Sequence, residues 1–166
     1  MWKHNLTILA LDPGTRKTGY AFFAGDELLF HGVKVLAQGR TPKQTLDYGH
    51  LAVLTLLRTL KPDVLAVEQA HFSNRTRRTA LLNDFTNTIV ALGKRERMRV
   101  FTFAPSTIKK FTTGYGWARK EQVARVVAHQ YPELRAYLTG AKHWQTVHHG
   151  NMFDAVALGM LARQKL

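Results

Sequence analysis

The stretch that most constrains the fold is residues 6–23, where an apolar run ends in one carboxylate, turns, and is followed by a second apolar run. Residues 6–12 contain few polar positions, which predicts a strand buried on both faces. Pro13 and Gly14 predict a turn directly after Asp12. This pattern holds an acid rigidly at the exposed end of a buried strand, so Asp12 is the first candidate site residue.

Size and charge limit the kind of protein that this chain can be. With 166 residues, 45% of them hydrophobic, we expect one domain over residues 1–166 with a sizeable core. The formal net charge of +13 favours a polyanionic partner, although charge alone does not separate DNA from RNA. There is no cysteine, which excludes disulfides and thiolate zinc sites. No apolar run is long enough for a membrane span, so we expect no membrane partner and a cytoplasmic location.

The order of predicted elements indicates an α/β fold. Strands over residues 6–12, 18–24 and 27–36 are joined by short turns, as in an antiparallel meander. A helix opened by Thr41 and Pro42 leads to a buried strand over residues 64–68, and this strand–helix–strand order implies parallel pairing. The remaining predictions are a helix over 75–96, a strand over 99–103, helices from Pro105, over 120–131 and over 152–163, and a His-rich loop over 139–150. We therefore expect a five-stranded mixed sheet flanked by helices.

Three acids stand where such a fold would expose them to one site. Asp12 and Glu68 each end a buried strand, and Asp154 lies near the start of the predicted last helix. Neighbouring carboxylates would repel one another and raise each other's pKa, a conflict that a divalent cation removes. Oxygen ligands of this kind suit Mg²⁺ or Mn²⁺, and two such ions would activate water and stabilise the leaving oxygen in phosphodiester cleavage. If the acids were structural instead, we would expect nearby basic partners in salt bridges.

Four segments in this order match the motifs of a known family. They are D-P-G-T-R-K-T-G from Asp12, V-E-Q from Val67, the set A-P-S-T-I-K-K, G-Y-G and K-E-Q-V between Ala104 and Val123, and D-A-V-A-L-G from Asp154. On these segments the sequence resembles the RuvC-type Holliday junction resolvases, which have a ribonuclease H-like fold. The first and third segments are the most specific, and the likeness spans most of the chain without separating a bacterial from a phage origin.

The resemblance implies a homodimer that binds a four-way DNA junction and nicks two strands symmetrically, using Mg²⁺ or Mn²⁺. Carried over by position, Asp12, Glu68 and Asp154 would be metal ligands. Lys120 would match a lysine near the scissile phosphate, where it stabilises developing negative charge. Lys109 would match a DNA-contacting lysine.

The chain departs from the family pattern at Asn151, where the family has an acid or a His three residues before the last Asp. An i, i+3 pair shares one helix face, so Asn151 could offer its amide oxygen as a weaker ligand. It could equally be the N-cap of the last helix. His148 and His149 lie just upstream and could supply the missing ligand, or could be ordinary surface residues.

A second departure follows Glu68. The family places an aromatic residue there to stack on junction bases, and His71 and Phe72 fill that neighbourhood with a spacing one residue longer. Phe72 is suited to stacking if exposed, but it could also be a core residue. Basic residues expected to contact DNA phosphates are Arg75, Arg77, Arg78, Lys110 and Arg119. Between the last two lie Tyr115 and Trp117, and Trp117 could serve nucleic acid binding, the core or a dimer contact.

The sequence leaves several functions open. The first is a structure-selective, metal-dependent endonuclease that resolves four-way junctions. Alternatives on the same fold are a nuclease for flaps, other branched DNA or hybrids, and a junction-binding protein without catalysis. An actin-like or sugar-kinase ATPase is suggested by the turn after Asp12, but that architecture needs two such domains and 166 residues are too few.

Overall fold

The computed structural model describes residues 6–70, 76–138 and 143–166, the last range with its side chains from residue 149 onward. At its centre is a five-stranded sheet in the order β3-β2-β1-β4-β5. The strands are β1 (Thr7–Asp12), β2 (Lys17–Ala24), β3 (Glu27–Val35), β4 (Val64–Glu68) and β5 (Arg99–Phe103). The first three pair antiparallel, whereas β4 pairs parallel with β1 and β5 parallel with β4. The predicted mixed sheet is therefore confirmed.

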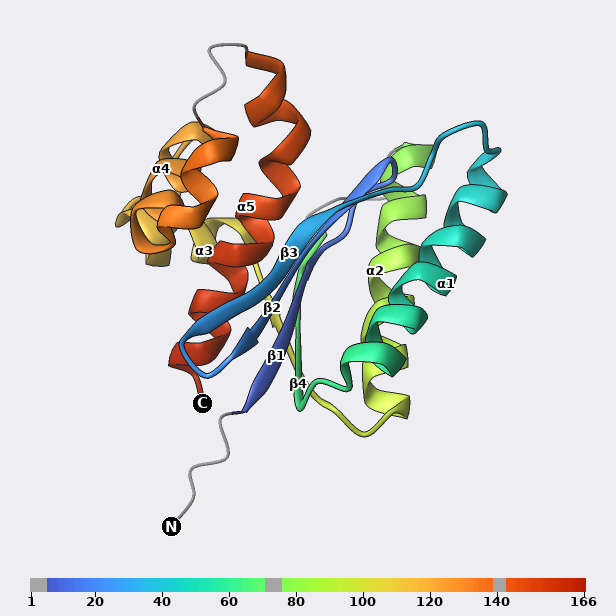
Figure 1. Ribbon diagram of the computed structural model, residues 1–166. Helices are drawn as coiled ribbons and strands as arrows, with labels where there is room; N and C mark the ends of the chain where they lie inside the picture. Colours follow the sequence, from blue (N-terminus) through green and yellow to red (C-terminus); the bar gives the residue numbers. More distant parts are fainter. Residues whose placement is uncertain (1–5, 71–75, 139–142) are drawn as a thin grey trace.

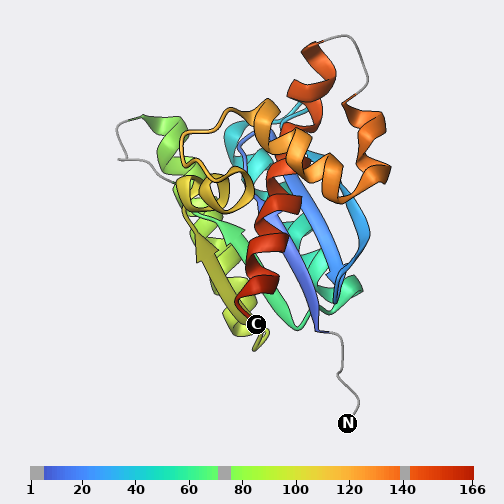
Figure 2. The same cartoon turned by 90° about the vertical axis from the view of Figure 1, so that its left-hand side faces the viewer.

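Helices cover both faces of the sheet (Figures 1 and 2). One layer consists of α1 (Pro42–Leu60) and α2 (Arg77–Arg95). The other consists of α3 (Pro105–Thr113), α4 (Lys120–Gln130), the short 3₁₀ helix η1 (Pro132–Tyr137) and α5 (His143–Gln164). Within the described ranges, none of the helices is long and apolar enough to span a membrane.

Local capping explains where the helices of the first layer begin. Thr41 caps α1 as predicted: its hydroxyl accepts a hydrogen bond from the Gln44 amide at 3.3 Å, and the Gln44 side chain accepts one from the Thr41 amide at 2.9 Å. Pro42 occupies the first turn, where its missing N–H has no cost. Thr76 caps α2 in the same manner with Thr79, so α2 begins two residues later than the predicted residue 75.

The last helix is longer than predicted, and this corrects the expected His-rich loop. Residues 143–150 belong to α5, which begins at His143 rather than at Met152. These residues carry no strong helix signal of their own, but extending a helix that is already stabilised by packing needs no new nucleation. Asn151 therefore lies inside a helix and is not its N-cap.

The alternation of side chains along β1 and β4 assigns the two strand-end acids to one face. Ile8 and Ala10 belong to the core shared with α3, α4 and α5, whereas the intervening Leu9 and Leu11 belong to the core shared with α1 and α2. Val64 and Ala66 alternate with Leu65 and Val67 in the same way. Because the period of a strand is two, Asp12 and Glu68 continue the series that faces α5.

Small residues bring α5 close to that face. Ala10, Ala21 and Ala66 line the sheet beneath the helix, and all three are fully buried. The backbones meet at Gly19 of β2, where an added Cβ would lie 1.9 Å from the carbonyl oxygen of Asn151. Only glycine permits this approach, because the neighbouring atom belongs to the backbone and cannot rotate away.

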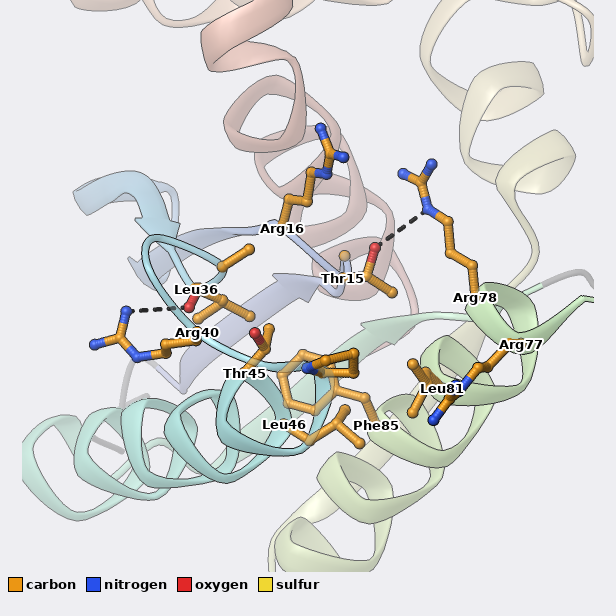
Figure 3. A pocket seen from close by; sticks show the side chains of 13 residues that line it. Thr15, Arg16, Leu36, Arg40, Thr45, Leu46, Arg77, Arg78, Leu81 and Phe85 are labelled. Carbon is orange, nitrogen blue, oxygen red and sulfur yellow. Dashed lines mark hydrogen bonds between the residues drawn. The ribbon is translucent and has the colours of Figure 1, made fainter.

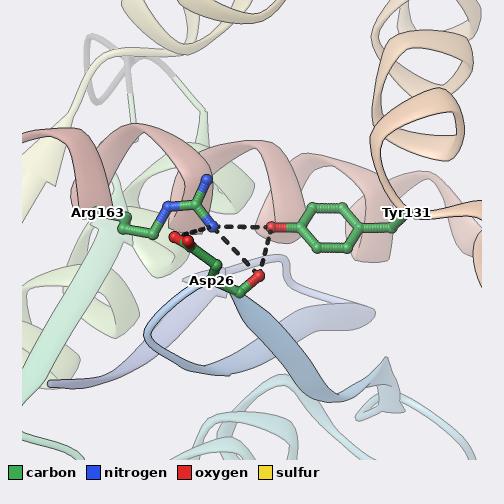
Figure 4. A network of polar contacts seen from close by, with 3 residues as sticks. All are labelled: Asp26, Tyr131 and Arg163. Atoms are coloured by element: carbon green, nitrogen blue, oxygen red, sulfur yellow. Dashed lines mark hydrogen bonds and ion pairs between the residues drawn. The ribbon is translucent and has the colours of Figure 1, made fainter. Parts of the chain in front are cut away.

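The far end of α5 is tied to the sheet by a polar cluster (Figure 4). Arg163 Nη1 lies 3.4 Å from the carboxylate of Asp26, in the β2–β3 turn, and donates to the Tyr131 hydroxyl at 3.2 Å. Tyr131 follows α4 and packs edge-on against Phe23 of β2, with ring centroids 5.9 Å apart. The cluster therefore joins α4, α5 and the hairpin at the end opposite the strand-end acids.

We predict that Gly19→Ala destabilises the protein and displaces α5. Overpacking typically costs about 1–3 kcal/mol, and a clash with backbone should lie at the upper end. For a domain of this size the melting temperature should fall by roughly 5–10 °C, as measured by calorimetry. Gly150→Ala is the matched control, because its Cβ would meet only the Lys120 side chain at 3.8 Å and should leave stability unchanged or raise it. Equal melting temperatures for Gly19→Ala and the parent would contradict this account of the helix position.

Candidate active site

The site is built first on two neighbouring parallel strands. Leu11 of β1 pairs with Val67 of β4, so the next residues, Asp12 and Glu68, lie side by side at the carboxyl ends of these strands. This edge of an open α/β sheet is where ligands commonly bind. Asp12 is 7% exposed, whereas Glu68 is partly exposed. The expectation that these two strand-end acids face one site is confirmed.

Asp154 and Lys120 complete the cluster from the helical layer. Asp154 lies in the middle of α5, and its carboxylate is 3.2 Å from Nζ of Lys120, the first residue of α4. The lysine side chain is 61% exposed, so this ion pair contributes little to stability. Its importance is positional, because it holds an ammonium group beside the acids.

The pKa values show that the three acids act on one another. Burial, then the neighbouring charges of Glu68 and Asp154, raise the pKa of Asp12 well above its ordinary value. Burial and the charge of Asp154 raise the pKa of Glu68 to about 8. Burial also raises the pKa of Asp154, although Lys120 opposes the shift. In turn Asp154, and more weakly Asp12 and Glu68, raise the pKa of Lys120. The four groups therefore share one electrostatic environment with an excess of negative charge.

The chemistry of this donor set fits a divalent cation, although the side chains are not arranged as a ready-made metal cage. Among the residues with described side chains, no group of three or more His, Asp or Glu is placed to hold a metal ion. Asp12 accepts a hydrogen bond from Asn151, and Asp154 pairs with Lys120. Three carboxylates that raise one another's pKa would nevertheless be stabilised by a divalent cation, and hard oxygen ligands suit Mg²⁺ or Mn²⁺. Binding would require these side chains to turn toward a common point.

The residues predicted as further ligands have different surroundings. Asn151 Nδ2 donates to Asp12 Oδ2 at 2.8 Å. In this arrangement the amide N–H group stabilises the Asp12 carboxylate, and the amide oxygen does not act as the predicted metal ligand. His149 lies on α5 with its ring 4.7 Å from that of Tyr137 in η1. The side chain of His148 lies outside the described residues.

Several predicted DNA-binding residues lie around the acids. Lys109 of α3 lowers the pKa of both Glu68 and Asp154, which places its charge near them. Lys110 is exposed on the same helix, and Arg119 is exposed directly before α4. Of these three cations, Lys109 acts on the acids, and Arg119 directly precedes Lys120 in the chain.

A second basic region lies on the opposite face of the sheet (Figure 3). A cavity of about 650 Å³ opens between the turn after Asp12, the start of α1 and the start of α2. Arg77 and Arg78 line it, and Arg78 Nε donates to the Thr15 hydroxyl at 3.3 Å. Phe85 and Leu46 form part of its apolar wall. His71, Phe72 and Arg75 lie outside the described residues.

Sequence reasoning did not single out two further arginines of this cavity, Arg16 and Arg40. Arg16 belongs to the D-P-G-T-R-K-T-G motif after Asp12, and its positive charge in that motif is a signal that could have indicated this role. Arg40 stacks on the ring of Tyr48, with 3.8 Å between the guanidinium carbon and the ring centroid. No local pattern indicates that packing, because Tyr48 is brought to Arg40 by the direction of α1.

A mixed sheet of this order, with acids at the ends of two parallel strands and on the last helix, defines a ribonuclease H-like fold. The chain belongs to the RuvC family: the family model described as crossover junction endodeoxyribonuclease RuvC matches residues 8–140. The match includes Asp12, Glu68 and Lys120, whereas Asn151 and Asp154 lie beyond it. The structure brings these two residues to the site, because Asn151 contacts Asp12 and Asp154 contacts Lys120.

Individual proteins and structures agree with this family. The RuvC of Chlorobium phaeovibrioides is 30% identical over 128 residues, which cover 74% of this chain and 68% of that protein. The RuvC of Rickettsia typhi is 27% identical over 134 residues, which cover 76% of this chain and 83% of that protein. The structure of Thermus thermophilus RuvC in complex with Holliday junction substrate has a TM-score of 0.72, 23% identity and 96% coverage of both chains. The yeast mitochondrial Holliday junction resolvase Ydc2 has a TM-score of 0.65 and 15% identity, covering 97% of this chain and 82% of its own. At these identities the two structures support the fold.

We predict that Glu68→Gln stabilises the metal-free protein at neutral pH. The pKa of Glu68 rises from an ordinary value of 4.5 to about 8 on folding, so the folded state binds its proton more tightly than the unfolded state does. The contribution of Glu68 to the free energy of unfolding is therefore fully present below pH 4.5 and is lost as the pH rises to about 8. The glutamine variant avoids that loss, so its advantage in free energy of unfolding should grow between these pH values.

Denaturant unfolding in the presence of a chelator, repeated across this pH range, measures the difference. Asp84→Asn, a change of the same kind at an exposed position of α2, is the control and should show no such growth. An advantage of Glu68→Gln that does not change with pH would contradict the electrostatic explanation.

Proposed function

We propose that this chain is a structure-selective endonuclease that resolves four-way DNA junctions by paired, symmetric nicks, with residues 1–166 acting as one nuclease domain. The single observation that carries the proposal is the cluster of Asp12, Glu68 and Asp154 beside Lys120, in a chain that belongs to the RuvC family. The formal net charge of +13 agrees with a polyanionic substrate. The names of the related proteins supply the substrate class.

In this proposal Asp12, Glu68 and Asp154 hold Mg²⁺ or Mn²⁺, with two ions per site. Bound there, such ions supply Lewis acidity at the phosphate and lower the pKa of a water molecule. The protein itself positions the ligands. The register of β1 and β4 sets two carboxylates side by side, and α5 brings the third. Asn151 orients Asp12 through its 2.8 Å hydrogen bond.

Lys120 has the role of a charge-stabilising group. Its side chain is 61% exposed, and its ammonium stands 3.2 Å from the Asp154 carboxylate. If Asp154 held a cation, this ammonium would be free to pair with a phosphate oxygen that gains negative charge in the transition state. Lys109 adds a second positive charge near the same acids.

The remaining basic residues are proposed to hold the DNA arms. Lys110 is exposed on α3 and Arg119 directly precedes Lys120, whereas Arg77 and Arg78 line the cavity on the other face of the sheet. Arg75, His71 and Phe72 stay predictions as phosphate or base contacts. Two nicks placed symmetrically need two sites, so we propose a homodimer, which light scattering of the purified protein measures directly.

We predict that Asp154→Asn abolishes cleavage while junction binding persists. Loss of one charged ligand removes several kcal/mol of charge stabilisation, so the rate should fall by about 10³-fold or more. Cleavage of a labelled four-way junction with Mg²⁺ or Mn²⁺ measures the rate, and gel shift in chelator measures binding. Flaps, hybrids and linear duplex, assayed in parallel, test the substrate class. A parent protein that binds junctions and cuts none of these substrates would overturn the proposal in favour of a binding protein.

We predict that Lys120→Gln lowers the rate of the bound complex by about 10²–10³-fold, because one group that stabilises the transition state is lost. Junction affinity should change little. Lys110→Gln is the matched control on the neighbouring helix: it should weaken affinity and reduce the salt dependence of binding by about one phosphate contact, with the single-turnover rate preserved. Equal effects of both changes on affinity and rate would show that Lys120 is an ordinary phosphate contact.

A further inference from the structure

The loop between α3 and α4 presents two aromatic side chains to solvent. Tyr115 is 60% exposed and Trp117 is 82% exposed, whereas Ala118, next to Trp117, is buried at 1%. A tryptophan is on average a highly buried residue, so an indole this exposed on an ordered loop is unusual. From the sequence, Trp117 could be a core residue, a dimer contact or a nucleic acid contact. Its exposure excludes a place in the core.

The loop is fixed by its own backbone contacts. Gly114 ends α3 in the left-handed region, with φ of 82°, and its amide donates to the Lys110 carbonyl. The Tyr115 amide donates to the Thr113 hydroxyl at 3.2 Å, and the Ala118 amide donates to the Tyr115 carbonyl at 3.1 Å. The two rings therefore project from a preformed turn, and binding to them costs little ordering of the backbone.

The surroundings of the loop select a polyanionic partner. From Pro105 to Arg125 the sequence has five basic residues and one acid, Glu121. Lys110 and Arg119 flank the two aromatics, and Lys120 follows three residues after Trp117. A flat aromatic face between cations suits a nucleobase attached to its phosphates, because the ring stacks on the base while the cations hold the backbone.

We propose that Tyr115 and Trp117 form a stacking platform for unpaired nucleobases of a DNA strand, beside the Lys120 end of the acid cluster. The position of this platform in a catalytic complex rests on the proposed function, but base binding by itself does not. In a paired and stacked duplex the base faces are covered, so the platform distinguishes a strand with unpaired bases, such as one at a branch point, from a continuous duplex.

The test measures binding in chelator, where no cleavage occurs, with oligothymidylate, a linear duplex and a four-way junction as probes. Trp117→Ala should weaken oligothymidylate binding by about 10-fold, the range expected for loss of one stacked base, and change duplex binding less than about twofold. Trp117→Phe should restore most of the affinity. Leu51→Ala removes an apolar side chain that is 61% exposed on α1, and it is the control. This change should leave the affinity for all three probes the same as in the parent.

Fluorescence supplies a second readout. Oligothymidylate should quench the tryptophan emission of the parent, and this quenching should largely disappear in Trp117→Phe. Equal losses on single strand and duplex, or no loss on either, would overturn the platform. A Trp117→Ala variant with a lower molecular mass by light scattering would identify a contact between two copies of the chain instead.

The two proposals fail separately. If the parent cuts no branched DNA but Trp117→Ala loses its preference for unpaired bases, the platform stands and the nuclease proposal falls. If the parent resolves junctions and Trp117→Ala binds every probe as the parent does, the platform falls alone.

Discussion

The structure depends on one electrostatic constraint, which is that three carboxylates are held where they repel one another. Asp12 and Glu68 are fixed by the register of β1 and β4, and Asp154 by the position of α5. The cost is visible in their pKa values, which all lie above the ordinary range. Lys120 offsets only part of this repulsion. The fold therefore stores an unfavourable charge arrangement, of the kind that a divalent cation relieves and that active sites commonly contain.

The rest of the molecule is arranged to hold this cluster. Apolar cores on both faces stabilise the sheet, and small residues on one face let α5 approach closely enough for Asn151 to reach Asp12. The contact at Gly19 shows how narrow that approach is, because no side chain fits between strand and helix. Stability from the cores thus supports a site that by itself destabilises the folded state, a division of roles that is common in enzymes.

The carboxyl edge of the sheet separates two basic regions that the proposed substrate would contact. On one side, α3 and α4 surround the acids with lysines and present Tyr115 and Trp117. On the other side, arginines line the cavity beside the turn after Asp12. The turn that follows β1 begins directly after Asp12 and lines the arginine cavity, so it lies between the two regions. In the proposed complex, one DNA strand would pass the acids while neighbouring phosphates meet arginines across this edge.

Local patterns in the sequence determined the strands, most helix boundaries, the position of Asp12 and Glu68 at strand ends, and the family, because alternation, capping and turn chemistry act over a few residues. Tertiary structure alone decided the rest. The helical state of residues 143–150 depends on packing of the whole of α5. The sequence therefore allowed Asn151 to be an N-cap, whereas in the fold it lies inside α5 beside Asp12. The arginine cavity joins the turn after Asp12 to the starts of two helices, and the exposure of Trp117 depends on what lies around its loop. Both are determined by contacts between segments far apart in the chain, which no local sequence pattern contains.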